Sequence, residues 1–177
     1  MIDSATGKII FDDGAIVDPQ ITRTAFLASS LSLNSEASDA PAPPWSSFKL
    51  APRAMDGLVF LFGAELYFKG EVLAHVDLWQ IDWTVTPSND HARDSSGWDD
   101  WTMEGEIDRQ KRNEAWLASF LGPPHECTPN RYDPAEALND KIYRFAWGTI
   151  ESCFDAKTGG TALVVTYDSA KTEVAAP

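Results

Sequence analysis

The chain combines a large excess of acidic residues with many aromatic ones, a pairing that restricts what it can fold into. It has 27 acidic residues against 14 basic ones, a formal net charge of −13, and its 177 residues include seven Trp, nine Phe and four Tyr. Acidic disordered segments are poor in aromatic side chains, because they cannot bury enough apolar surface to fold. The aromatic content therefore predicts a folded chain, and the charge predicts a negative surface.

The length fits one domain, which buries about 70% of its unfolded surface without help from disulfides or metal ions. We expect a single α+β domain over residues 1–177, with a long loop at 29–47 and a frayed tail at 168–177. The apolar runs are shorter than the ~20 residues that cross a bilayer, and no signal peptide is visible, so a cytoplasmic location is expected. Cys127 and Cys153 are then predicted to be free thiols.

The clearest strand signal lies in the centre of the chain. Residues 57–62 form an apolar run that Tyr67 and Phe68 continue, and after a turn at 69–71 a long strand is expected over 72–83. The apolar side of that strand switches past Leu78, which predicts a bulge near 78–80. The two segments should pair as an antiparallel hairpin.

A helix is predicted over 99–121, because acidic residues stand at its start and Gly122-Pro123-Pro124 would end it. Short strands are expected at 8–12 and 16–17, and a second long hairpin pairs 141–155 with 161–167. The predicted fold class is α+β, with a curved antiparallel sheet of about six strands wrapped over one long helix.

None of the candidate catalytic motifs lies in the structural context that its chemistry requires. The strings at 46–49 (S-x-x-K) and 157–159 (K-T-G) match short motifs of serine β-lactamases, but the first follows a proline-rich loop and the second falls at a hairpin tip. His125 and Cys127 lack a second pair of metal ligands. We therefore expect no catalytic residues, no metal and no cofactor, although an unrecognised hydrolase that uses His75 and a carboxylate, or two carboxylates, remains an alternative.

One acidic segment also carries tryptophans and is the leading candidate for a partner interface. Aromatic anchors ringed by charge are typical of binding hot spots, and the carboxylates would pair with Arg or Lys of a partner. The alternative is a helix start whose tryptophans pack inward. The candidate residues are Trp98, Asp99, Asp100, Trp101, Glu104, Glu106 and Asp108.

A second hypothesis is a small-molecule binding module. Its ligand would lie on the concave face of the sheet, held by Trp79, Trp83 and Trp147. An apolar pocket of a few hundred Å³ would favour this hypothesis.

The C-terminal half has a recognisable pattern. A helix ending in Trp116-Leu117-x-x-Phe120-Leu121-Gly122, an aromatic strand with Trp147-Gly148, and an apolar strand that follows Gly159-Gly160 and ends at Tyr167 make up this pattern. Over roughly residues 45–167 the chain resembles a group of small uncharacterised bacterial proteins, some of which are immunity proteins that bind and silence a toxin. The resemblance implies a fold and a small bacterial protein, and it carries no functional residues.

The charge narrows the class of partner. Nucleic-acid recognition needs a basic footprint, and anionic membranes repel an acidic surface. A basic protein would be attracted at long range. The charge therefore predicts a non-enzymatic acidic protein-binding domain with a basic protein partner and no nucleic acid or membrane as partner. The resemblance implies that this domain is an immunity-type inhibitor of a basic toxin.

Overall fold

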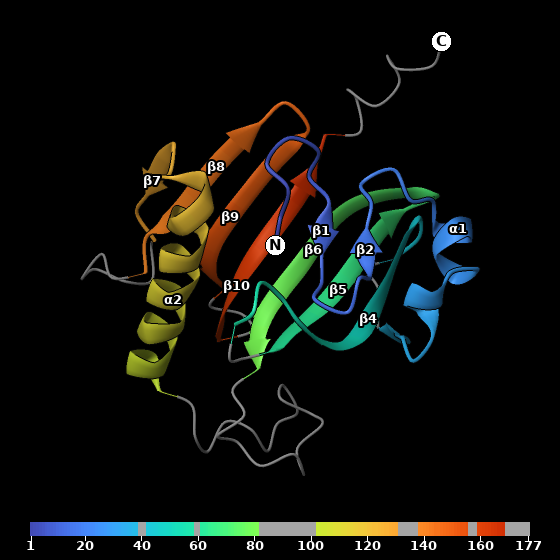
Figure 1. The fold of residues 1–177 in the computed structure, drawn as a ribbon, viewed down its shortest axis with the longest axis horizontal. Coiled ribbons are helices and arrows are strands. Elements are labelled where there is room, and N and C mark those ends of the chain that lie inside the picture. The colour runs from blue at the N-terminus through green and yellow to red at the C-terminus, as the bar shows by residue number, and fades with distance from the viewer. Residues whose placement is uncertain (39–41, 59–60, 82–101, 131–137, 156–158, 169–177) are drawn as a thin grey trace.

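The computed structural model describes residues 1–38, 42–58, 61–81, 102–130, 138–155 and 159–168. Over these residues the chain forms an eight-stranded antiparallel sheet, a separate two-stranded sheet and one long helix (Figure 1). The predicted α+β class with an antiparallel sheet and a long helix is confirmed.

The strands of the large sheet are not in chain order. Their spatial order is β3-β4-β5-β6-β10-β9-β8-β7, so the last strand of the chain lies in the middle of the sheet, between β6 and β9. The strand bounds are β3 (Glu36–Ser38), β4 (Trp45–Ala54), β5 (Leu61–Lys69), β6 (Val72–Ile81), β7 (Glu126–Thr128), β8 (Asp140–Phe145), β9 (Gly148–Asp155) and β10 (Gly160–Tyr167).

The described strands outnumber the predicted six because one predicted strand is divided, because part of a predicted loop is regular, and because β7 lies where no strand was predicted. The segment 141–155, predicted as one strand, is broken where the chain turns at Ala146-Trp147, and Gly148 follows the turn with a φ of 153°. A Cβ at Gly148 would lie 1.9 Å from the carbonyl oxygen of Thr166, so the sheet needs glycine there. In addition, part of the predicted loop 29–47 is regular structure, because β3 and the start of β4 fall within it.

The central hairpin pairs β5 with β6 through a turn at Gly70, whose φ is 64°. The bulge predicted near 78–80 lies instead at the other end of β6, where the register shifts between Tyr67 and Phe68 of β5. From Val76 to Gln80 every second side chain is buried on one face. Gln80 belongs to that buried set although it is polar, and this is why the sequence suggested a switch of face there.

The N-terminal segment covers one half of the sheet (Figure 1). Its elements are β1 (Ile9–Ile10), β2 (Ile16–Val17), α1 (Arg23–Leu27) and η1 (Ser30–Ser32). Strands β1 and β2 lie within the predicted segments 8–12 and 16–17 and pair antiparallel, and Thr22 caps α1 by accepting a hydrogen bond from the Ala25 N–H. Phe26 of α1 packs on Phe48 and Phe68, with ring centroids 5.1 and 5.6 Å away.

The long helix α2 (Met103–Leu121) covers the other half of the sheet and contacts β9 and β10 (Figure 1). Thr102 caps its first turn, and Gly122, with a φ of 78°, ends it at the predicted residue. Trp116 packs on Phe62 of β5 at 5.5 Å. The sheet is therefore not wrapped over α2 alone, because the N-terminal elements share that face. Among the described helices, none is long and apolar enough to cross a membrane.

Both edges of the large sheet are short. The edge strands β3 and β7 have three residues each. Beyond β7, the backbone N–H of Arg144 in β8 donates to Nδ1 of the His125 ring at 2.8 Å, and the N–H of His125 donates to the carbonyl of Ile142. A side chain thus continues the hydrogen bonding where the edge strand stops.

Gly63 of β5 gives a test of the central hairpin. A Cβ at this position would lie 2.2 Å from the ring of Trp79, which faces Gly63 from β6. We predict that Gly63→Ala lowers the free energy of unfolding by about 1–3 kcal/mol, because overpacking forces a side chain off its rotamer. Urea denaturation measures the change.

The control is the same substitution in a Trp79→Ala background. With the ring gone, Gly63→Ala should be neutral or stabilising, since alanine loses less backbone entropy than glycine in a strand. An equal cost in both backgrounds would show that the ring contact is not the cause.

Candidate functional site

The sheet has two faces of different chemistry. The covered face carries apolar side chains such as Phe62, Leu66, Val76 and Leu163, and α1, α2 and the N-terminal hairpin all pack on it. Because successive side chains of a strand point to opposite sides, the residues between these lie on the other side, here called the opposite face. The described helices and the small sheet make their contacts with the covered face, so the opposite face is the candidate interaction surface.

A row of mostly acidic side chains crosses the whole opposite face at right angles to the strands. The strand register pairs each member with the next across neighbouring strands, so the members lie side by side on one face. In spatial order the row, called here the cross-strand row, is Glu36, Lys49, Glu65, Asp77, Val164, Glu151, Ile142 and Glu126.

The electrostatics of the row follow from its composition. Burial raises the pKa of the Glu151 carboxyl above its ordinary value, and Asp140 and Glu126 raise it further, against a smaller lowering by Arg144. Burial likewise raises the pKa of Asp140. Arg144 binds Glu126 at 2.5 Å at the end of the row. Asp140 and Glu126 therefore contribute a negative potential at Glu151, and a cation placed there would be stabilised.

Cys153, two residues after Glu151 on the same face, is influenced by the same carboxylates. Burial raises the pKa of its thiol, and the carboxylates of Glu151, Asp140, Asp77 and Asp155 raise it further. A thiol in such surroundings stays protonated and is a poor nucleophile.

Aromatic rings flank the row on both sides. On one side Tyr67 stacks on His75, with ring centroids 4.2 Å apart and planes 17° from parallel. On the other side the Trp79 ring lies over Gly63. Burial lowers the pKa of His75, and Glu65 opposes that effect. The net lowering favours a neutral imidazole, which leaves the row without a histidine cation.

Glu65 is held in place from the edge of the sheet. Its carboxylate Oε1 accepts a hydrogen bond from the Ser38 hydroxyl, which also lies 2.6 Å from the Ser47 hydroxyl. Glu65 is buried, whereas Lys49, its register partner on β4, is exposed. These hydroxyl contacts fix the carboxylate in the plane of the row.

On the covered face, the part of α2 from Glu106 to Asn113 is attached by hydrogen bonds. Glu106, Gln110 and Asn113 are spaced along one side of the helix and are buried. Glu106 Oε2 accepts the backbone N–H of Thr161 at 2.8 Å, and its other carboxylate oxygen pairs with Arg109. The Gln110 side-chain NH₂ donates to the carbonyl of Asn139 at 2.9 Å.

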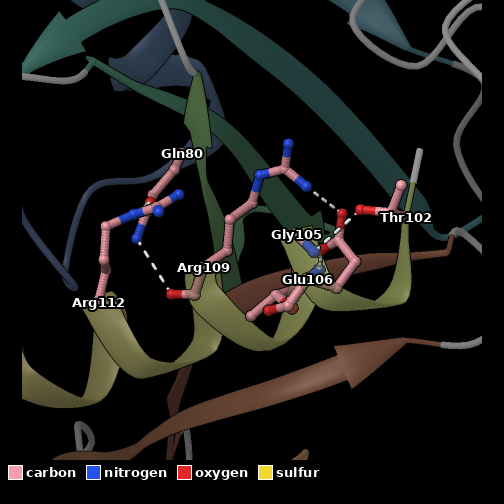
Figure 2. A network of polar contacts seen from close by, with 7 residues as sticks. Gln80, Thr102, Gly105, Glu106, Arg109 and Arg112 are labelled. Atoms are coloured by element: carbon pink, nitrogen blue, oxygen red, sulfur yellow. Dashed lines mark hydrogen bonds and ion pairs between the residues drawn. The ribbon is translucent and has the colours of Figure 1, made fainter. Parts of the chain in front are cut away.

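Gln80 adds to these hydrogen bonds from the side of the sheet. Together, Gln80, Glu106, Gln110 and Asn113 are here called the polar seam. In Figure 2 it points from β6 toward α2, beside Arg109 and Arg112. Its NH₂ donates to Asn113 Oδ1 at 2.6 Å, and its Oε1 accepts from Arg112 Nε at 2.9 Å. Because the side chains of Gln80 and Asn113 are buried and bond to each other, they hold the helix on the sheet.

The predicted acidic interface is therefore only partly open to a partner. Glu104 and Asp108 are exposed on α2, and Asp108 lies 3.5 Å from Lys111. Glu106 is 3% exposed and bonded to Thr161, so its place in an exposed interface was wrong. Helical periodicity explains the error, since residues two apart face different sides of a helix. Trp98, Asp99, Asp100 and Trp101 lie outside the described residues.

The predicted tryptophan pocket is not assembled. Trp79 lies on the opposite face, whereas Trp147 lies in the turn between β8 and β9, packs on Tyr167 of the covered face at 5.8 Å, and donates to the carbonyl of Ser4 at 2.9 Å. The two rings are on different sides of the sheet, so they cannot share a ligand. Trp83 lies outside the described residues.

The two cysteines are free. Cys127 in β7 stands opposite Lys141, a residue of the covered face, while Cys153 lies on the opposite face of β9. Among the described residues, no group of three His, Cys, Asp or Glu side chains is placed to hold a metal ion.

Sequence reasoning missed the cross-strand row. Each strand does carry a signal, since Glu65, Asp77 and Glu151 occupy the polar positions of alternating strands. The missing information was the register of strands distant in sequence, above all the insertion of β10 between β6 and β9.

Comparison of the chain with family models, with curated proteins and with solved structures gives no match. The assignment of function therefore depends on the arrangement of its own residues.

Glu106 and Glu104 form a matched pair for testing the seam. We predict that Glu106→Leu lowers the free energy of unfolding by about 2–3 kcal/mol, because it leaves the buried Thr161 N–H without an acceptor. Glu104→Leu should cost at most about 1 kcal/mol, through the helix dipole. Chemical denaturation measures both, and Glu106→Gln, which keeps an acceptor oxygen, should fall between them. An equal loss of unfolding free energy in the two leucine variants would contradict the stabilising role of Glu106 in the polar seam.

Glu151 tests the field of the row. A carboxyl whose pKa is raised on folding opposes folding when it is ionised; this cost is complete above the folded-state pKa and disappears as the pH falls below the unfolded-state pKa. We predict that Glu151→Gln raises the midpoint of thermal unfolding at about pH 7, and that this gain vanishes by about pH 4. Asp108→Asn, a change of an exposed carboxyl on α2, is the control and should show no such pH-dependent gain. A Glu151→Gln effect that is independent of pH would count against this account of the field.

Proposed function

We propose that this chain is a non-enzymatic acidic protein-binding domain, an immunity-type inhibitor of a basic toxin, and that it binds through the opposite face of the sheet. The observation that carries the proposal is the cross-strand row, which places carboxylates on six of the eight strands of an open sheet when Asp140 on β8 is counted with it.

The charge balance of that face supports a cationic partner. The net charge of the whole chain is −13, and the carboxylates of Asp140 and Glu126 add to the effect of burial in raising the pKa of Glu151. Like charges held side by side on neighbouring strands are mutually destabilising. A basic surface laid over the row would remove that repulsion and would be steered toward it from a distance.

The aromatic flanks support a protein partner over a free ion. Trp79, Tyr67 and His75 are partly buried beside the carboxylates, so they offer apolar contact area around a charged centre. Tryptophan, tyrosine and arginine dominate the binding energy of protein interfaces, and guanidinium groups stack on aromatic faces.

The test is a binding and inhibition assay against a panel of purified, positively charged bacterial nuclease toxins, measured at low and high salt. We expect nanomolar to micromolar binding to at least one member, inhibition of its nuclease activity, and a dissociation constant that rises steeply with salt.

Two charge-reversed variants locate the surface. Glu36→Lys combined with Glu151→Lys and Asp155→Lys, all on the opposite face, should weaken binding at least about tenfold and flatten its salt dependence. Glu104→Lys with Asp108→Lys, on α2, should leave the dissociation constant nearly unchanged. Binding to none of the toxins, or binding that ignores salt and the opposite-face reversal, would refute the proposal.

A further inference from the structure

The spacing of the carboxylates in the cross-strand row carries information about the shape of what binds there. Adjacent strands lie about 4.8 Å apart, so residues two strands apart on one row are separated by about 9.6 Å. Asp77 and Glu151 stand in this relation, with Val164 of β10 between them. Glu151 and Glu126 stand in the same relation, with Ile142 of β8 between them.

The row thus alternates acid and apolar residue over five neighbouring strands: Asp77, Val164, Glu151, Ile142 and Glu126. Val164 and Ile142 are partly exposed, so each forms an apolar floor between two carboxylates. A partner would need cations at intervals of about 9.6 Å on one side, with apolar groups between them that can contact the two floors.

Regular backbones differ in whether they meet this requirement. A β-strand presents side chains on one side about every 6.8 Å, an interval that does not match the spacing of about 9.6 Å between the carboxylates of the row. The polyproline II helix has three residues per turn and rises about 3.1 Å per residue, so every third side chain lies on the same side at intervals of about 9.3 Å. This interval agrees with the row to within about 0.3 Å per step.

Resting on the proposed function, we propose that the opposite face docks an extended polyproline II segment of the basic partner, lying across the strands with an arginine or lysine at every third position. The cations contact Asp77, Glu151 and the end of the row at Glu126, where a partner cation competes with Arg144, which lies 2.5 Å from Glu126. The residues between the cations, proline in the ideal case, contact Val164 and Ile142. Charge complementarity requires a positively charged segment, and the alternation of acidic and apolar residues requires one cation at every third position.

The experiment uses peptides of identical composition that differ only in the order of residues. One carries three repeats of Arg-Pro-Pro, a second clusters the three arginines between two runs of proline, and a third alternates arginine with proline before a proline tail. All three favour the same backbone, so only the spacing of charge differs. Binding to the full chain is measured by NMR titration at low salt.

We expect the period-three peptide to bind about three- to tenfold more tightly than the other two, since it alone can form two or more ion pairs with the row at once. Its binding should shift the methyl signals of Val164 and Ile142. Equal affinities for all three peptides, or an unchanged Val164 signal at saturation with the period-three peptide, would overturn the inference.

Matched variants test the residues. Asp77→Asn with Glu151→Gln should remove the preference for the period-three peptide, whereas Glu104→Gln with Asp108→Asn on α2 should keep it. Persistence of the preference in the first variant would also overturn the inference. A toxin that binds in a salt-dependent way while no peptide discriminates would leave the proposed function intact and refute only the docking geometry, and failure of every toxin to bind would refute the function itself.

Discussion

Register between strands that are distant in sequence is the constraint on which this structure depends. The pairing of β10 with both β6 and β9 brings Val164 between Asp77 and Glu151, and it places Leu163 and Val165 on the core side at the same time. A slip of one residue would exchange the two faces, burying carboxylates and exposing the core. The same register that fixes the hydrophobic core therefore fixes the acidic row.

The attachment of α2 follows a different rule from the rest of the core. The N-terminal elements are held by aromatic packing, as Phe26 is on Phe48 and Phe68. Farther toward its start, α2 is held by Glu106, Gln110 and Asn113, whose partners lie on β6, on β10 and on the chain before β8. Hydrogen bonds are directional, so they fix the helix at one rotation about its axis, whereas apolar contacts alone tolerate repacking. The apolar contribution of the helix comes from its C-terminal part, where Trp116 and Leu117 are buried and the partly buried Phe120 and Leu121 pack against the core.

Local patterns in the sequence predicted much of this fold. Gly122 ends the helix, the hairpin at Gly70 joins two long strands, and the pairing of β1 with β2 follows from a short turn. The predictions failed where a residue's role depends on a distant partner. Gln80 was misread because its amide is buried against Asn113, and Glu106 was placed on the surface because the N–H of Thr161 lies 55 residues away. The cross-strand row could not be predicted for the same reason: each strand supplies one member, and only the order and register of the strands bring the members together.

The short edges of the sheet have a consequence for how the molecule meets other proteins. A long unpaired edge offers a template on which a further strand can add, and this leads to polymerisation of sheets from end to end. Here each edge strand has three residues, and the ring of His125 occupies the backbone donor of Arg144 just beyond one of them. Lateral growth is thereby discouraged on both sides, and association is left to side chains standing on a broad surface, where charge and shape can discriminate among partners in a way that generic backbone pairing cannot.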